Sequence, residues 1–264
     1  MRSCFGLRVM AHQLRRYADW ALHPRPWAAG RGEAAAFPAL AIERTSPLQR
    51  APDGAISSYC AEKTQNLGLA CAKVDGLVIA PGEVFSFCRT VGPTTRRAGY
   101  LPALELRDGA LGPAVGGGLC QLANLLFLLA VQVNAEIVER HRHSYDLFRD
   151  AGRTVPFGCG ATVFYNYVDF QFRNTLAVPL LLRAAVEPPL LRAALYAPGP
   201  LPFTVEIVET DHRFFRRDGA IYRANRLWRA VAWHDGRTTR ELLLENECRV
   251  RYAAEDLVDS PLPP

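Results

Sequence analysis

A cysteine directly behind a run of glycines is the sharpest chemical signal in this sequence of 264 residues. The run Gly116-Gly117-Gly118-Leu119-Cys120-Gln121 leads into a long apolar stretch. Glycines before a helix let the backbone turn tightly, and the amides at the helix start carry partial positive charge. This charge lowers the pKa of a thiol in the first turn. We therefore expect Cys120 to be a nucleophile, with the neighbouring amides and the Gln121 side chain as an oxyanion hole.

Two histidines form the second signal, in the run Arg140-His141-Arg142-His143-Ser144. On a strand that continues from residues 136–140, His141 and His143 would point to the same face. Either imidazole could then serve as general base to Cys120, since base and nucleophile meet in space rather than in sequence. The hypothesis that follows is a cysteine-dependent amide hydrolase or acyl transferase. In it, Cys120 attacks and His143, or His141, takes the proton.

Two other interpretations of the same residues stay open. In a non-catalytic binding module, the glycine loop and the helix start would hold a carboxylate or a phosphate, helped by Arg140 or Arg142. A small or peptide-like ligand with a free carboxylate suits that arrangement. In a purely structural role, the glycines permit close packing and the histidines satisfy backbone groups.

The elements expected to position these residues give an α+β protein. The stretch 119–133 is apolar nearly all round, which is typical of a buried central helix. Further helices are expected over residues 7–20 and 57–73. Expected strands cover residues 77–79, 84–87, 104–107, 136–140, 162–173, 179–186 and 190–196, with a hairpin turn at Asp108-Gly109. We therefore predict a central buried helix packed on an antiparallel sheet.

Breaks in composition divide the chain into three expected segments. Residues 1–50 form an N-terminal extension that is partly helical, and residues 51–197 form the main domain. Residues 198–264 form a small β-rich C-terminal appendage, in which Asp218-Gly219 and Asp235-Gly236 are turn signals.

Composition excludes several classes of function. The chain is 49% hydrophobic and has a formal net charge of +5, which is typical of a globular protein. Its basic residues are dispersed rather than clustered, so we expect no nucleic-acid partner. No apolar run reaches the ~20 residues of a membrane-spanning helix, and the N-terminus lacks the apolar region of a secretory signal. We therefore expect no transmembrane segment.

The seven cysteines include no Cys-x-x-Cys pair, and their spacing offers no cluster of metal ligands. Free thiols in a reducing cytoplasm are the simplest account, so we expect a cytoplasmic protein without a metal site. Neither a dinucleotide-binding motif nor a phosphate-binding loop is present, so no cofactor is expected. The sequence carries no signature of oligomeric state.

Several motifs in order along the chain resemble the VanW family. The run Ala80-Pro81-Gly82-Glu83-Val84-Phe85-Ser86-Phe87 is similar to the opening of that domain. Residues 116–121 and 139–144 are similar to its centre. The run Gly158-Cys159-Gly160-Ala161-Thr162-Val163 and residues 168–174 resemble its end. Several ordered motifs together are far more specific than any one of them.

The resemblance implies a bacterial protein that is linked by name to vancomycin resistance, and so to peptidoglycan-precursor metabolism. A cysteine at a helix start, with histidine and aspartate on following strands, would form a transglutaminase- or papain-like triad. Many members have an aspartate where this chain has Gly160, so the obvious third member is missing here. Asp169 or Asp146 would then have to orient the histidine.

Overall fold

Helix α4 (Cys120–Gln132) lies at the centre of the structure, and the other elements of the core pack around it. The computed structural model describes residues 2–49, 59–107, 110–143, 145–146, 155–254 and 257–258. Nine of the thirteen residues of α4 are buried, among them Leu122, Leu126 and Phe127. A helix that is apolar on every side gains most when it is surrounded on every side. The prediction of a buried central helix is therefore confirmed.

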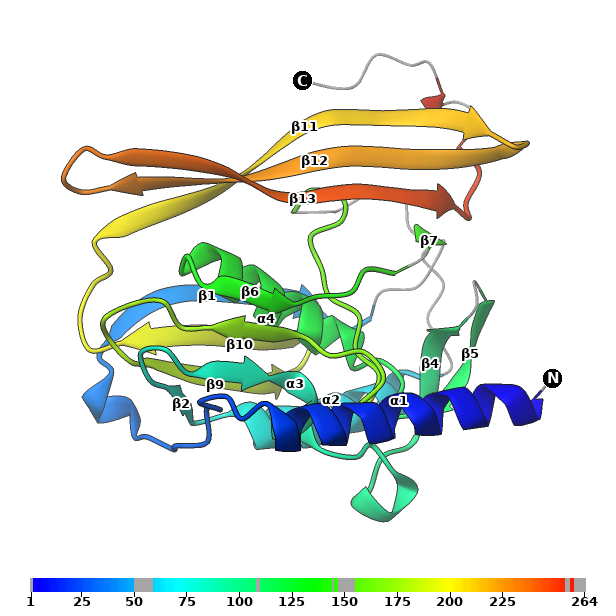
Figure 1. The fold of residues 1–264 in the computed structure, drawn as a ribbon, viewed down its shortest axis with the longest axis horizontal. Helices are drawn as coiled ribbons and strands as arrows, with labels where there is room; N and C mark the ends of the chain where they lie inside the picture. The colour runs from blue at the N-terminus through cyan, green and yellow to red at the C-terminus, as the bar shows by residue number, and fades with distance from the viewer. Residues whose placement is uncertain are drawn as a thin grey trace.

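Other helices of the described chain lie along the sides of this core (Figure 1). They are α1 (Arg2–Leu22), α2 (Cys60–Val74) and α3 (Phe87–Val91), with the short 3-10 helices η1 (Ala34–Ala36) and η3 (Arg96–Ala98). The buried side chains of α2 include Leu67, Ala70 and Val74, which follow one another at helical spacing. Helix α3 begins where the Ser86 hydroxyl accepts a hydrogen bond from the Arg89 amide, so the strand expected over 84–87 ends one residue early.

The main sheet is antiparallel, with the strand order β1-β10-β9-β2. Its strands are β1 (Ala39–Pro47), β2 (Leu77–Ile79), β9 (Leu180–Glu187) and β10 (Leu190–Ala197). Helix α4 contacts β1 and β10, whereas α2 contacts β9. The chain therefore has a mixed α+β fold in which the central helix packs on an antiparallel sheet.

Strand β1 comes from the segment that was expected to be an extension of the domain. It nevertheless pairs with β10 from Ala39 to Pro47 and forms one edge of the main sheet. Residues 39–47 are thus part of the core sheet, although nothing in their composition distinguishes them from the residues before them.

Two smaller sheets lie next to the core. One has the order β3-β8-β6 and consists of β3 (Val84–Ser86), β6 (Glu136–Glu139) and β8 (Gln171–Arg173). The other is the hairpin of β4 (Pro102–Arg107) and β5 (Ala110–Val115). The turn expected at Asp108-Gly109 lies outside the described residues. So do Ser144 and the first two residues of the helix expected over 57–73, Ser57 and Ser58.

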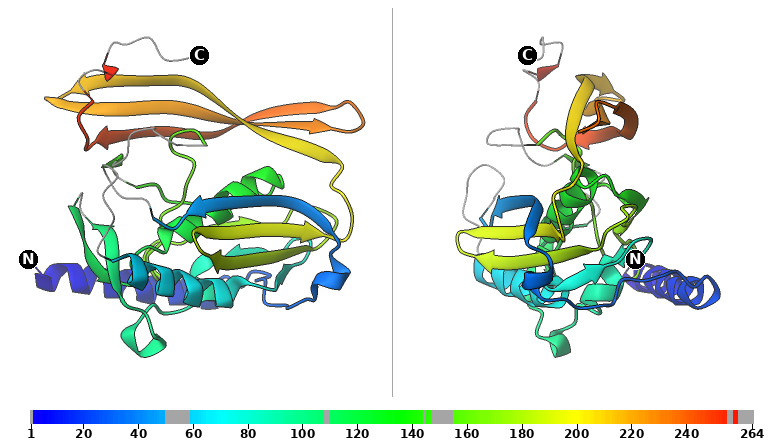
Figure 2. Two further views of the ribbon diagram at one scale, coloured as in Figure 1. Left: turned by 180° about the vertical axis from the view of Figure 1, so that it is seen from behind. Right: turned by 90° about the vertical axis from the view of Figure 1, so that its left-hand side faces the viewer.

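The C-terminal part forms a long, twisted sheet that lies along one side of the core (Figures 1 and 2). Its order is β11-β12-β13-β7, from β7 (Tyr145–Asp146), β11 (Phe203–Arg217), β12 (Ala220–Trp233) and β13 (Thr238–Val250). The turns at Asp218-Gly219 and Asp235-Gly236 lie between its strands, where the sequence predicted them. Buried Arg223 of β12 pairs with buried Asp146 at 3.1 Å and so connects the sheet to the core segment.

Two of the expected strands are shorter than the sequence indicated. Only Gln171–Arg173 of the stretch 162–173 pairs in a sheet, because residues 164–168 close a tight turn around Asn166, whose φ is 50°. The strand expected over 136–140 ends at Glu139, and residues 140–143 that follow lie outside any strand. The premise that both histidines lie on a strand is therefore wrong.

The glycine turn, Gly116-Gly117-Gly118, is held between α2 and β4. Gly116 and Gly118 have φ values of 82° and 91°, which residues with a side chain rarely adopt. A Cβ atom on Gly117 would lie 2.0 Å from the carbonyl oxygen of Ala103 in β4. The buried amide of Asn66 in α2 donates to the Gly117 carbonyl at 3.0 Å. These contacts fix the point at which α4 begins.

Replacing Gly117 with alanine should therefore disrupt the packing of the turn on β4. We expect Gly117→Ala to lower the free energy of unfolding by about 3 kcal/mol, since the clash is with backbone that cannot move aside cheaply. The matched control is Gly112→Ala in β5, where an added Cβ meets no atom within 4 Å. Urea denaturation at neutral pH measures both. Equal stability of the two variants would contradict the tight packing of the turn.

Candidate functional site

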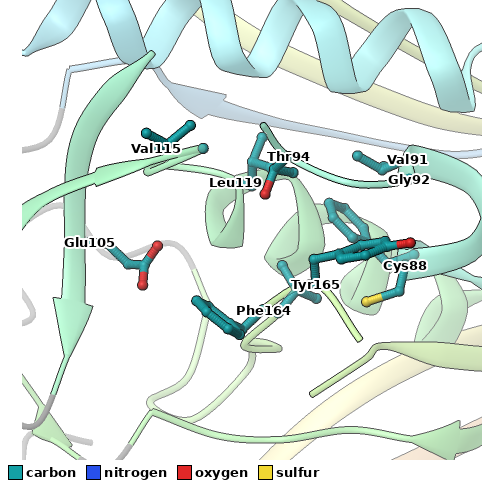
Figure 3. A pocket seen from close by; sticks show the side chains of 12 residues that line it. Cys88, Val91, Gly92, Thr94, Glu105, Val115, Leu119, Phe164 and Tyr165 are labelled. Carbon is teal, nitrogen blue, oxygen red and sulfur yellow. The ribbon is translucent and has the colours of Figure 1, made fainter. Parts of the chain in front are cut away.

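A pocket opens beside the glycine turn, between α3 and the turn at residues 163–165. Its empty space is about 380 Å³, part of it open to solvent. Gly116 and Leu119, at the start of α4, line one side. In Figure 3 the Glu105 carboxylate and the Thr94 hydroxyl point into this space, and the Phe164 ring lies across from them. The pocket thus adjoins the motif that the sequence analysis singled out.

The lining of this pocket is aromatic and apolar around one acidic group. Phe87, Phe164 and Tyr165 supply rings, and Glu105 of β4 is the one charged side chain among its described lining residues. A half-buried carboxylate in such surroundings attracts a cation and repels an anion. The pocket is therefore suited to an ammonium group next to an apolar part, which the sequence analysis did not foresee because an acid in a hairpin usually faces solvent.

Cys120 begins α4, but its thiol is not activated. Its Sγ lies 3.7 Å from the carbonyl oxygen of Val163, to which the thiol donates. Burial, with a smaller contribution from the negative charge of Glu105, raises the pKa of the Cys120 thiol to about 11. The expectation that the helix start lowers this pKa is wrong. Loss of solvent and a nearby carboxylate outweigh the partial charge of the helix end.

His141 has a partner other than Cys120, and no bond to Cys120 is seen for His143 among the described residues. His141 Nε2 lies 3.0 Å from a Glu139 carboxylate oxygen. Burial lowers the pKa of His143, and the charge of Arg140 lowers it further. Within the described part of the chain, no histidine forms a hydrogen bond with the Cys120 sulfur. The structure thus shows no hydrogen bond between Cys120, the expected nucleophile, and either of the two expected bases.

Arg140, an expected anion-binding residue, holds a loop instead. Its guanidinium donates to the carbonyls of Gly160 and Gly158, at 2.8 and 2.6 Å, and lies over the Phe127 ring of α4. Burial lowers the pKa of Arg140 to about 10. Arg142 is exposed, and neither arginine is part of the pocket lining. The guanidinium of Arg140 therefore meets backbone oxygens where a ligand anion was expected.

Packing explains why residue 160 is a glycine in this chain. A Cβ atom on Gly160 would lie 2.4 Å from the side-chain oxygen of Asn124 in α4. That oxygen accepts a hydrogen bond from the Ala161 amide at 2.8 Å. An aspartate here would displace Asn124, so Gly160 and Asn124 fit together as a pair.

The other candidate polar residues are engaged elsewhere. Gln121 donates to the Ser46 hydroxyl and the Pro47 carbonyl of β1, at 2.8 and 2.7 Å, so it does not supply an oxyanion hole in this arrangement. Asp146 accepts hydrogen bonds from Arg223 and from Tyr252, in the C-terminal part. Its position on β7 places it with the C-terminal sheet rather than with the histidines.

Asp169, the other candidate orienting acid, is fully buried in a second polar cluster. It accepts hydrogen bonds from the Ser86 hydroxyl at 2.5 Å, the Cys88 amide at 2.8 Å and the Gln171 amide group at 2.9 Å. Burial raises the pKa of Asp169 and these bonds oppose the increase. No histidine of the described chain is among its hydrogen-bond partners. Asp169 thus joins β3 to β8 and does not orient an imidazole.

Glu139, which the sequence analysis passed over as a candidate, binds the N-terminal helix. Arg16 of α1 makes a two-pronged ion pair with its carboxylate, with one of the two contacts at 2.6 Å. Burial opposes ionisation of Glu139, but the bonds from Arg16 and His141 outweigh it and hold the pKa of Glu139 at about 2. No local pattern marks Arg16, because its partner lies 123 positions away.

The described residues contain no helix long and apolar enough to cross a membrane. They contain no group of three or more histidine, cysteine and acidic side chains placed to hold a metal ion. The cysteines at 60, 71, 88, 120, 159 and 248 are free thiols.

Comparison with known sequences identifies the class of protein to which this pocket and fold belong. The chain belongs to the family of VanW-like proteins, which matches residues 62–196, a little more than half of its length. The matched segment contains the glycine turn, α4 and both histidines. Helix α1 and the strands β11 to β13 lie outside it.

Two relatives make the comparison specific. Over 225 residues the chain is 28% identical to the vancomycin B-type resistance protein VanW of Enterococcus faecalis. The matched stretch covers 84% of this chain and 82% of that relative. Over 125 residues it is 36% identical to the uncharacterized protein YoaR of Bacillus subtilis. That matched stretch covers 46% of this chain and 39% of that protein. No solved structure matches the chain.

The raised pKa of Cys120 predicts a slow thiol. At pH 7 we expect iodoacetamide to alkylate Cys120 roughly two orders of magnitude more slowly than an unperturbed thiol, because little thiolate is present. The rate should rise about tenfold with each pH unit below the pKa. Timed alkylation followed by peptide mass spectrometry measures it, and the urea-unfolded protein is the control. Alkylation at pH 7 faster than in the unfolded chain would contradict this account.

The ion pair between Arg16 and Glu139 predicts a pH-dependent stability. The folded-state pKa of Glu139, about 2, lies below the ~4.3 of an unfolded chain. Its ionised form therefore stabilises the fold above about pH 4.3, and this contribution is lost as the pH falls through about 2. We expect Arg16→Met to lower the free energy of unfolding by about 2 kcal/mol at pH 7, and by less near pH 2.

Urea denaturation across this pH range tests the prediction. The control is Arg15→Met, which removes the neighbouring, exposed arginine of the same helix. Equal losses in the two variants at pH 7 would show that the ion pair contributes nothing specific.

Proposed function

We propose that this VanW-like protein acts in glycopeptide resistance or cell-wall metabolism by binding a peptide-like, amine-bearing cell-wall fragment in the pocket beside the glycine turn. The observation that carries the proposal is the Glu105 carboxylate pointing into an aromatic pocket, next to a Cys120 thiol with a pKa of about 11. A pocket with this carboxylate can recognise a positive charge, whereas a thiol with so high a pKa does not act as a nucleophile at neutral pH.

The lining matches the amine and the apolar part of such a ligand. Glu105 would pair with an ammonium group, and the rings of Phe164 and Tyr165 would cover the apolar part. Gly116 and Leu119 bring the start of α4 to the same pocket, so the ligand would lie against the glycine turn. Short peptides of the cell wall carry an amine next to apolar groups, and resistance to a glycopeptide concerns peptides of this kind.

A cysteine-dependent amide hydrolase or acyl transferase is the second candidate. It is favoured by the place of Cys120 in the first turn of α4, beside Leu119 and Val163 of the pocket lining. That mechanism needs a rearrangement that breaks the bond to the Val163 carbonyl and brings His141 or His143 to the sulfur. A papain- or transglutaminase-like arrangement of these residues belongs to this candidate alone.

The binding proposal is tested with the peptide Nα-acetyl-L-Lys-D-Ala-D-Ala and its Nα,Nε-diacetylated form. Isothermal titration calorimetry should show tighter binding of the free amine. We expect Glu105→Gln to weaken binding of the free amine about tenfold, which is ~1.4 kcal/mol, because a charged partner is lost. The diacetylated peptide should bind both proteins equally. The control variant is Glu136→Gln on β6, whose carboxylate is exposed and outside the pocket.

Two results would count against binding at this site. One is equal affinity of wild type and Glu105→Gln for the free amine. The other is release of D-alanine from the peptide by wild type but not by Cys120→Ala, detected by chromatography of the same mixtures, which would favour the hydrolase instead.

A further inference from the structure

Helix α1 carries most of the exposed apolar surface of the described chain. Five of the eight large hydrophobic side chains that are exposed belong to it, and Leu14 and Leu22 are 61% and 73% exposed. The five are Leu7, Met10, Leu14, Tyr17 and Leu22. Figure 2 shows α1 on the outside of the molecule, and no other described element covers its outer side. Scattered exposed apolar residues are ordinary, but a concentration on one helix indicates an interaction site.

The apolar residues of α1 share one face. Leu7, Met10, Leu14 and Leu22 recur at helical spacing, and Ala11, Ala18 and Ala21 fill the positions between them. Residues at this spacing form a continuous stripe along the helix. We call this surface the apolar stripe.

The face of α1 that docks on the core is held by polar as well as aromatic contacts. Arg16 pairs with Glu139, and the Gln13 side chain donates to the Tyr165 carbonyl at 3.1 Å. The Trp20 ring stacks under the Arg89 guanidinium at 4.8 Å. These contacts fix the rotation of α1 about its own axis. These contacts therefore hold the apolar stripe on the outer side of the helix.

Positive charge borders the stripe. By helical spacing, exposed Arg15 lies at its edge. The acid of α1, Asp19, pairs with His23 and Arg25. Long arginine side chains beside an apolar face are suited to anionic headgroups, because their stems lie along acyl chains while the charge stays in the headgroup layer.

We propose that α1 docks the protein on the surface of an anionic lipid bilayer, with the apolar stripe inserted at the headgroup boundary and the helix axis parallel to the surface. An outward apolar stripe with an exposed arginine at its edge is typical of an interfacial helix. The formal net charge of +5 acts in the same direction.

A second copy of the chain fits the stripe less well. The stripe extends over residues 7–22, about two heptads, whereas a stable coiled coil takes at least three or four. Pairing of two such helices would bring arginines of like charge close together.

Docking through α1 would bring the pocket close to the bilayer. Tyr165 lines the pocket, and its hydroxyl lies 2.7 Å from that of Tyr17 in α1. One residue therefore contacts both the helix and the pocket. The membrane proposal rests on the exposed face of α1 and does not depend on which ligand the pocket takes.

Vesicle flotation with the full chain tests the proposal. The probe is a set of large vesicles of phosphatidylcholine with about 30% phosphatidylglycerol, compared with vesicles of phosphatidylcholine alone. We expect the wild-type protein to float with the anionic vesicles and to be released as the salt concentration rises. Leu14→Glu should reduce the bound fraction about tenfold, and Arg15→Glu should reduce it on anionic vesicles.

The matched control is Leu242→Glu, which changes an exposed leucine of β13 in the same way and should leave flotation unchanged. Because Leu14 is exposed, its variant should keep the wild-type circular dichroism and melting temperature. Wild-type protein that stays at the bottom of the gradient would overturn the proposal, as would equal flotation of Leu14→Glu. A dimer in sedimentation velocity that Leu14→Glu converts to a monomer, without vesicle binding, would assign the stripe to a second copy instead.

Discussion

The backbone of Gly117 lies against the Ala103 carbonyl of β4, and this close approach fixes where the central helix begins. A side chain there would push the turn away from β4, and α4 would move with it. The amide of Asn66 holds the same turn from α2. Because α4 is buried on nearly every side, its position sets that of the main sheet, and the pocket forms where its first residues meet α3 and β4.

The electrostatics of Cys120 show how tertiary packing reverses a local rule. A helix start favours a thiolate, but the favourable energy is modest and requires solvent or a cation to share the charge. Here the thiol donates a hydrogen bond to the Val163 carbonyl, and the charged side chain that acts on the sulfur is the acid Glu105. Desolvation then dominates, and the glycine turn shapes a pocket without activating its neighbour.

The N-terminal helix depends on a different interaction, the ion pair between Arg16 and Glu139. This pair, with the bond from His141, keeps Glu139 ionised in a partly buried position. It also decides which face of α1 meets the core, and so which face meets the surroundings. A residue from the segment before the family domain thus completes a polar cluster within it.

The sequence by itself determined the elements whose signals are local. The apolar stretch of α4, the turns Asp218-Gly219 and Asp235-Gly236, and the strands β9 and β10 follow from periodicity and turn chemistry, which depend on neighbours along the chain. It also determined the family, because ordered motifs need no folding to be recognised.

Only the tertiary structure decided the partners of the polar residues. Arg140 binds loop carbonyls, Gln121 binds β1 and Glu105 enters the pocket, and each of these outcomes depends on residues far away in sequence. A side chain's charge state likewise depends on how much solvent the packed chain removes from it. Contacts across long separations and desolvation have no local signature, so the chemistry at Cys120 could not be read from the glycines that precede it.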